Sequence, residues 1–160
     1  MNEGFCASIQ EWQILVGRFI LAFGDIELLT YRIWRDRFSE NPPQRFGART
    51  KRIIAHLDEA AQADRALLAL LTKARELAKR RNVVAHNPVQ VQVFQHTATG
   101  KLYMENAIQC TKTHALIDDL ELMELASSAE SIVSKLYIEL GYIAPYDSQP
   151  AIQADASGTT

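Results

Sequence analysis

The sequence has few cysteines and no long apolar segment. Its two cysteines, Cys6 and Cys110, lack Cys-x-x-Cys spacing, so we expect free thiols in a reducing compartment. The start, MNEGFCAS, lacks the charged and apolar regions of a signal peptide. Arg18 and Asp25 interrupt the most hydrophobic stretch, which falls short of the roughly 20 residues that span a bilayer. These features predict a soluble, cytoplasmic protein that does not enter membranes.

The chain also lacks an excess of positive charge and any common catalytic motif. Seventeen basic and nineteen acidic residues give a formal charge of -2, so any contact with nucleic acid must be local. His56, His96 and His114 are scattered, with no ligand spacing to each other or to the cysteines. No Gly-rich phosphate loop, Gly-x-Ser-x-Gly elbow or His-Glu-x-x-His motif occurs. We therefore predict neither a metal site nor a cofactor.

The first half of the chain contains a long amphipathic segment. Ser8 and Glu11 form a capping-box pattern, and helical periodicity continues to about Phe38. One apolar stripe is expected in the core: Trp12, Leu15, Val16, Phe19, Ile20, Phe23, Ile26, Ile33 and Trp34. A second row lies on a different face: Ile14, Gly17, Leu21, Gly24, Leu28 and Tyr31. We interpret this row as a candidate dimer seam, although glycines at this spacing also occur where helices of one monomer cross.

Three further helices and a hairpin are predicted after this segment. The helices cover about 47–61, a stretch from Asp64 to His86, and one that starts at Asp118 and ends at Gly141. Alternating valines before a glycine turn predict a β-hairpin within 89–109, to which we assign no role. The prediction is an all-α bundle of four main helices with a small hairpin inserted before the last one. A single domain would span 1–144, with a disordered tail over 145–160.

An arginine is predicted on the buried face of the third helix. Arg81 falls in phase with Ala74, Leu77 and Ala78, and a buried cation is costly unless it is paired or reaches a cleft. Glu27, within the apolar stripe of the first helix, is the best candidate partner. Glu27 could instead bond a core hydroxyl such as that of Thr30.

Four polar residues form a ridge on the flank of the same helix. Arg75, Lys79, Asn82 and His86 follow one another at spacings of four, three and four residues. Arg75 and Lys79 are candidates for binding RNA, although a solvated face paired with Glu76 is the simpler interpretation. His86 lies at the helix end, where the dipole favours positive charge, but it could be only a helix-ending residue.

These residues suit metal-free cleavage of RNA, in which the 2'-OH attacks the adjacent phosphate. His86 can act as general acid or base, and Arg81 can stabilise charge developing on the phosphate oxygens. Asn82, one turn before His86, can orient the imidazole or a phosphate oxygen. One histidine cannot easily serve both sides of the phosphorus, so a two-fold dimer with two copies of the site is expected.

The segment Arg81-Asn82-Val83-Val84-Ala85-His86 resembles the Arg, polar residue, spacer, His signature of the HEPN superfamily. The resemblance covers most of the chain, because these proteins are helical bundles with the signature near the end of a long helix. It implies a dimeric, metal-independent endoribonuclease, often a toxin or phage-defence effector, with catalytic Arg81 and His86 and Asn82 as the polar position. Two alternatives stay open: a non-catalytic module that binds RNA or protein, and a toxin held inactive by an antitoxin or other regulatory protein.

Overall fold

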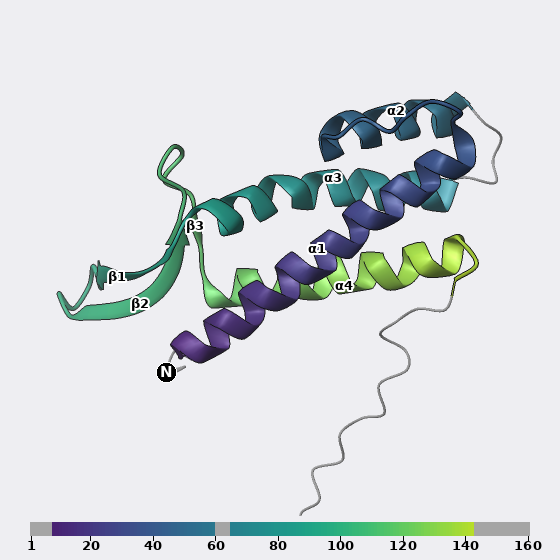
Figure 1. Cartoon of the computed structure of the whole chain (residues 1–160). Helices are drawn as coiled ribbons and strands as arrows, with labels where there is room; N and C mark the ends of the chain where they lie inside the picture. The colour runs from purple at the N-terminus through teal and green to yellow at the C-terminus, as the bar shows by residue number, and fades with distance from the viewer. Residues whose placement is uncertain (1–7, 60–64, 143–160) are drawn as a thin grey trace, which may run out of the picture.

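Four helices and a three-stranded sheet form the part of the chain that the structure describes, residues 8–59 and 65–142. The structure is a computed structural model, shown in Figure 1. Its elements follow in chain order: α1 (Ile9–Arg37), α2 (Phe46–Glu59), α3 (Arg65–His86), β1 (Val89–Gln95), β2 (Leu102–Gln109), β3 (Leu116–Ile117) and α4 (Asp119–Glu139). Three predictions concern residues that the structure does not describe: the Asp64 cap, the tail 145–160, and the two ends of the domain 1–144.

The ends of the long helices follow the polar signals in the sequence. The predicted capping box of α1 is present: Glu11 N donates to Ser8 Oγ at 3.2 Å, and Ser8 N donates to Glu11 Oε2 at 2.6 Å. Asp118 caps α4 by accepting from Glu121 N at 2.7 Å. Helix α4 ends just before Gly141, whose φ of +71° lies in the left-handed region that favours glycine.

The predicted all-α class is wrong, because the hairpin belongs to a three-stranded antiparallel sheet of order β1-β2-β3. Strand β3 pairs with the end of β2, with Ile108 opposite Ile117. The fold is therefore mixed, although helices dominate it. The sequence signal for β3 is weak, because two residues cannot show an alternating pattern. The tight turn after β2, which contains His114 at a φ of 56°, returns the chain and creates the strand.

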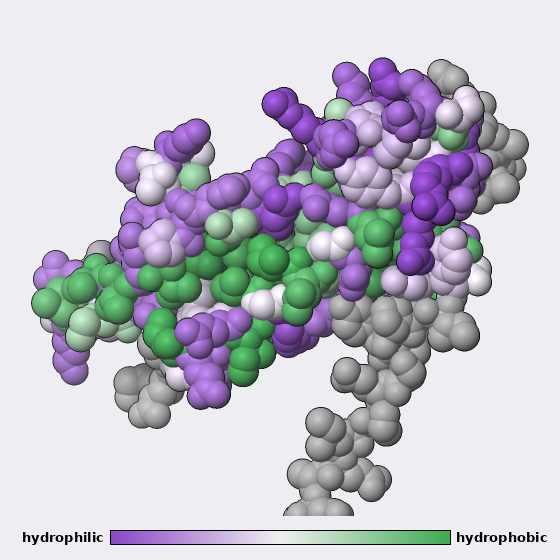
Figure 2. All heavy atoms as spheres, viewed as in Figure 1, coloured by the Kyte–Doolittle hydropathy of each residue, from purple (hydrophilic) through white to green (hydrophobic). Residues whose placement is uncertain are grey.

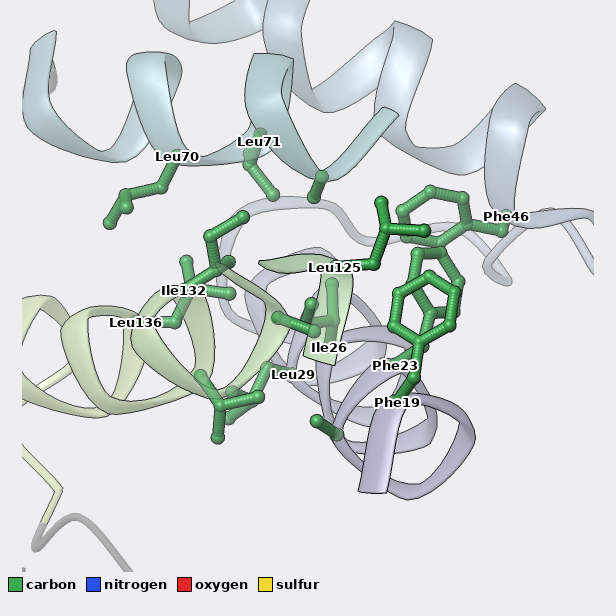
Figure 3. Close-up of a cluster of buried hydrophobic side chains, with 14 of the residues drawn as sticks. Phe19, Phe23, Ile26, Leu29, Phe46, Leu70, Leu71, Leu125, Ile132 and Leu136 are labelled. Carbon is green, nitrogen blue, oxygen red and sulfur yellow. The ribbon is translucent and has the colours of Figure 1, made fainter. Parts of the chain in front are cut away.

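The core lies where α1 meets the other helices. The predicted apolar stripe of α1 faces this core, with Leu15, Val16 and Ile20 at its partly buried edge. Figure 3 shows the labelled side chains that meet there: Phe19, Phe23, Ile26 and Leu29 from α1, Phe46 from α2, Leu70 and Leu71 from α3, and Leu125, Ile132 and Leu136 from α4. Helices α1 and α4 run in the same direction, whereas α3 runs back between α2 and α4 (Figure 1). This reversal carries the end of α3 to the base of the hairpin.

The hairpin of β1 and β2 extends away from the helices (Figure 1). At its base, Val89 packs against the core and Ile108 is buried within it. The same face continues toward the tip with Val91, Val93 and Met104 exposed, because no described residue covers it.

Within residues 8–59 and 65–142, no helix combines the length and apolar character needed to cross a membrane.

Cys110 is a free thiol that follows β2, whereas Cys6 lies outside the described residues. A hydrogen bond with the Thr113 hydroxyl lowers the pKa of the Cys110 thiol, so its thiolate should form at lower pH than that of an ordinary cysteine. In a Cys6→Ser background, we expect iodoacetamide to alkylate Cys110 with a midpoint pH below that of a free cysteine peptide. Thr113→Val should move this midpoint upward; an unchanged midpoint would contradict the assignment.

Candidate nucleic-acid site

Arg81 and Glu27 form an ion pair between α3 and α1. Arg81 Nη2 donates to Glu27 Oε1, which is the pairing that the periodicity of the two helices predicted. The guanidinium also lies over the Phe23 ring, 4.8 Å from its centroid. Arg81 Nε is buried and has no hydrogen-bond partner among the described residues. Arg81 is thus fixed in position while donor groups remain that Glu27 does not use.

A second arginine, Arg49, is almost fully buried and forms hydrogen bonds with residues around Glu27. Arg49 on α2 is only 1% exposed, and burial lowers the pKa of its guanidinium. Its Nε donates to Thr30 Oγ1 at 2.9 Å and its Nη1 to Pro43 O at 2.8 Å. Its Nη2 donates to the main-chain oxygen of Glu27 at 3.4 Å. Arg49 therefore connects α1, the segment before α2 and α2 itself.

Sequence reasoning missed Arg49, although a signal for it exists. Arg49 precedes Ile53 and Leu57 at helical spacing, so it shares the inward face of α2. Arg49 is thus, like Arg81, a cation in phase with the buried face of its helix. The same stretch also supplies Arg45, which the polar ridge of α3 gave no reason to consider.

An open hollow of about 520 Å³ lies beside the Arg81–Glu27 pair. Residues of α1, α2, α3 and the segment before α2 line it: Glu27, Gln44, Arg45, Phe46, Gly47, Arg75, Ala78, Lys79, Arg81 and Asn82. The structure thus brings together five of the six predicted site residues, namely Glu27, Arg75, Lys79, Arg81 and Asn82. Four cations and one carboxylate line the hollow, which makes it locally positive in a chain of net charge -2.

The start of α2 adds to the positive character of the hollow. Phe46 and Gly47, its first two residues, are among the lining residues. The first turn of α2 contains no acidic residue, and Arg45 stands before it in place of a Ser, Thr, Asn or Asp cap. The first N–H groups of a helix lack partners within the helix and attract anions. The N-terminal end of α2 therefore borders the hollow, although Ala48 N already donates to Arg45 O at 3.1 Å.

The ridge residues differ in how they are bound. Lys79 Nζ donates to Glu76 at 2.7 Å, so the simple interpretation of a solvated pair holds for this lysine. Arg75 and Arg45 are exposed and form no ion pair with any residue in 8–59 or 65–142. Arg80, the neighbour of Arg81, pairs with an acidic residue of α4 and does not reach the hollow. Arg45, Arg75 and Arg81 are therefore the cations best placed to receive an anion.

His86 is the predicted residue that the structure leaves outside the hollow. It is exposed, ends α3 and is not part of the lining. Ideal helix geometry puts it about 7.5 Å along the axis from Arg81 and about 140° around it, but only about 40° around from Asn82. Asn82, which does line the hollow, thus lies between the two.

The end of α3 is fixed by Asn87, whereas His86 is exposed there. Asn87 Nδ2 donates to Val83 O at 2.7 Å, and its Oδ1 accepts from Thr111 N at 3.4 Å. These bonds tie the last turn of α3 to the turn that follows β2. The His86 imidazole has no hydrogen-bond partner in the described part of the chain, so both its nitrogens are open to solvent.

Comparison of the chain with protein-family models, with curated proteins and with solved structures gives no match. Within residues 8–59 and 65–142, no group of three or more His, Cys, Asp or Glu side chains is arranged to hold a metal ion. The hollow and the end of α3 are therefore the features of the described chain that indicate a function.

Proposed function

We propose that this protein is a metal-independent endoribonuclease of the HEPN type that cleaves single-stranded or looped RNA as a dimer. One observation carries the proposal: the hollow that contains Arg81 is locally positive and lies next to the end of α3, where His86 is exposed. A phosphodiester is the anion that such a group of arginines can bind through two oxygens. Because the hollow is open, an unpaired RNA strand can bend into it more easily than a rigid duplex.

The reaction transfers the phosphoryl group from one ribose oxygen to another. A His86 imidazole removes the proton of the 2'-OH, and the 2'-oxygen forms a bond to phosphorus while the bond from phosphorus to the 5'-oxygen breaks. A second imidazolium gives a proton to the departing 5'-oxygen. The products are a 2',3'-cyclic phosphate and a 5'-OH end. Arg81 stabilises the extra negative charge on the phosphate, and Asn82 orients the imidazole or a phosphate oxygen.

The dimer follows from the position of His86. The reaction needs a base and an acid on opposite sides of the phosphorus, and each chain supplies one His86 that lies outside its own hollow. A two-fold pair of chains supplies two histidines and two hollows. In a cell, such an enzyme would act as a toxin or phage-defence effector in the cytoplasm. An antitoxin or other regulatory protein that covers the hollow would hold it inactive.

A second candidate function is a non-catalytic module that binds RNA or a partner protein. The absence of His86 from the lining of the hollow favours it, because the cations alone can bind phosphates without cleaving them. In this case Arg45, Arg75 and Arg81 would keep their roles, and His86 would only end the helix.

The deciding experiment is incubation of the purified protein with end-labelled mixed RNA in EDTA. Cleavage that leaves 2',3'-cyclic phosphate ends supports the ribonuclease, because no metal is available to activate water. RNA that is bound but remains intact supports the binding module. RNA that is neither bound nor cleaved removes both functions and leaves the hollow without a nucleic-acid role.

Replacing both Arg45 and Arg75 with alanine should weaken RNA binding and reduce its salt dependence. For a single strand, the slope of log K against log salt should become shallower by about 0.7 for each phosphate that the protein no longer neutralises. Fluorescence anisotropy with a labelled oligonucleotide, measured across a salt series, gives this slope. Lys73→Ala is the matched control, because Lys73 is exposed on α3 but does not line the hollow. Equal slopes for the double variant and wild type would place the RNA elsewhere.

A further inference from the structure

The row on α1 that the sequence marked as a candidate seam is an exposed apolar face. Ile14, Leu21 and Leu28 are 55%, 71% and 46% exposed. Gly17 and Gly24 lie between them, and a Cβ added at either would have no atom within 4 Å. Figure 2 shows an apolar band along α1 that continues toward the hairpin. Within residues 8–59 and 65–142, no other helix covers Ile14, Leu21 or Leu28. Tyr31, at the end of the row, is half-buried and contacts Arg49 of α2.

Two features make this face unusual for a helix that meets only water. Large apolar side chains at a regular seven-residue interval form a continuous seam rather than scattered exposed residues. Glycine is also among the least favourable residues in a helix interior, and here it occurs twice where no neighbouring backbone approaches. Glycines on a helix face allow another helix to come close, and the space they leave is still empty.

We propose that α1 packs antiparallel against α1 of a second copy of this chain, with large side chains of one helix seated over glycines of the other. In this arrangement Leu21 lies over Gly24 of the second copy, and Leu28 lies over Gly17 of the second copy. An antiparallel pair matches large positions with small ones, because these alternate along the row. A parallel pair would put glycine opposite glycine and leave gaps. The surface is thus self-complementary about a two-fold axis.

The charges beside the row select one register. Glu11, Arg18, Asp25 and Arg32 occur at seven-residue intervals next to the seam, with alternating sign. In the proposed register, Arg18 approaches Asp25 of the second copy and Glu11 approaches Arg32 of the second copy, each within about 3 Å along the axis. A shift by one heptad would bring Arg18 to Arg18 of the second copy, which is repulsive.

Arg18 also has a partner within its own chain, on α4. Its Nε and Nη2 donate to the two carboxylate oxygens of Glu130 on α4, at 2.8 and 2.7 Å. The guanidinium keeps further N–H donors that this pair does not use. Asp25 of the second copy would join an existing ion pair, so little additional ordering of the side chain is needed.

The arrangement has a consequence for the hollow. Glu27, which binds Arg81, lies on the side of α1 that borders the row. In the antiparallel register, the two Glu27 residues fall on the same side of the helix pair and about 13 Å apart along the axis. Both hollows would then open on one face of the dimer. The interface itself is argued from the surface of α1 and does not require that the protein cleave RNA.

The first test is the mass of the protein in solution, measured by light scattering after size exclusion and without RNA. Wild type should give twice the 18.0 kDa of one chain. Leu21→Lys should raise the dissociation constant of the dimer by at least about tenfold, because a lysine would be buried in the seam. Ile138→Lys is the matched control, since Ile138 is 63% exposed on α4 and lies outside the row. A wild-type monomer, or a dimer that Leu21→Lys leaves intact, overturns the proposal.

Gly24→Leu provides a second test that cannot fail through misfolding of the helix. The structure leaves open space at Gly24, and leucine is a better helix former than glycine, so the isolated chain should stay folded. The leucine would fill the space that Leu21 of the second copy needs, so we expect the dissociation constant to rise by at least about tenfold. Lys73→Leu adds an exposed leucine elsewhere and should leave the dimer unchanged. A Gly24→Leu variant that stays dimeric would contradict the proposed packing of Leu21 over Gly24 of the second copy.

These measurements separate the interface from the proposed ribonuclease. A dimer that Leu21→Lys weakens, but that cleaves no RNA, would support the α1 interface and contradict the ribonuclease activity. A monomer that cleaves RNA would support the ribonuclease activity and contradict the α1 interface.

Discussion

Replacing His86 with alanine should reduce RNA cleavage by about 10²- to 10⁴-fold, the usual contribution of a general acid or base. The fold should survive, because His86 is exposed and its imidazole makes no hydrogen bond within the described chain. The end of α3 is held by Asn87 rather than by His86. RNA binding should change little, since His86 does not line the hollow. The measurement is the single-turnover cleavage rate of a labelled RNA in EDTA, with binding followed in parallel.

His96→Ala is the matched control for this variant. His96 is exposed at the turn of the hairpin, and its hydrogen bonds to Lys101, Thr99 and Gly100 use only the main chain, so the substitution should leave cleavage at the wild-type rate. Cleavage by His86→Ala at that rate would show that the acid/base assignment is wrong. If His86→Ala and Arg81→Ala both retained full activity, the entire catalytic assignment would fail. Arg81→Ala is best combined with Glu27→Gln, which avoids leaving an unpaired carboxylate in the hollow.

The helices could be predicted because their signals are local. The capping pair of Ser8 and Glu11, the periodicity of α1 and the proline after Asn87 each act within a few residues. Strand β3 could not be predicted in this way. Its two residues are ordered by pairing with β2, and that pairing depends on the turn that brings Leu116 and Ile117 back to Ile108. Pairing of this kind is set by the tertiary structure.

The same distinction separates the predicted and missed parts of the site. Arg81 and Glu27 could be paired from sequence because each residue sits on the inward face of a helix whose periodicity is clear in the sequence. The contribution of Arg45 and of the α2 N-terminus could not, because it depends on how the segment 38–45 crosses to α2 (Figure 1). Helix periodicity also predicted that all four ridge residues would lie together, which the structure does not show for His86. It places Asn82 and His86 on one face, but only Asn82 reaches the hollow.

Arg49→Ala should lower the free energy of unfolding by about 3 kcal/mol, as expected when several buried hydrogen bonds and a large side chain are removed together. The substitution removes the donors to Thr30 Oγ1 and to the main-chain oxygens of Pro43 and Glu27. It also leaves a cavity beside the Tyr31 ring, whose centroid lies 3.5 Å from the guanidinium carbon. Urea denaturation followed by circular dichroism measures the change.

Arg52→Ala on the same helix is the matched control. Arg52 is exposed, and its 3.4 Å ion pair with Glu40 is of the kind that contributes at most about 1 kcal/mol. Equal decreases in stability for Arg49→Ala and Arg52→Ala would mean that other interactions hold the segment before α2.

Arg49→Lys distinguishes the buried charge from the shape of the guanidinium. A lysine keeps the charge but cannot donate in the three directions that reach Thr30, Pro43 and Glu27, so it should recover only a minor part of the stability. Since these bonds also position Arg45 and the start of α2, the decrease in RNA affinity should follow the decrease in stability across the Arg49 variants.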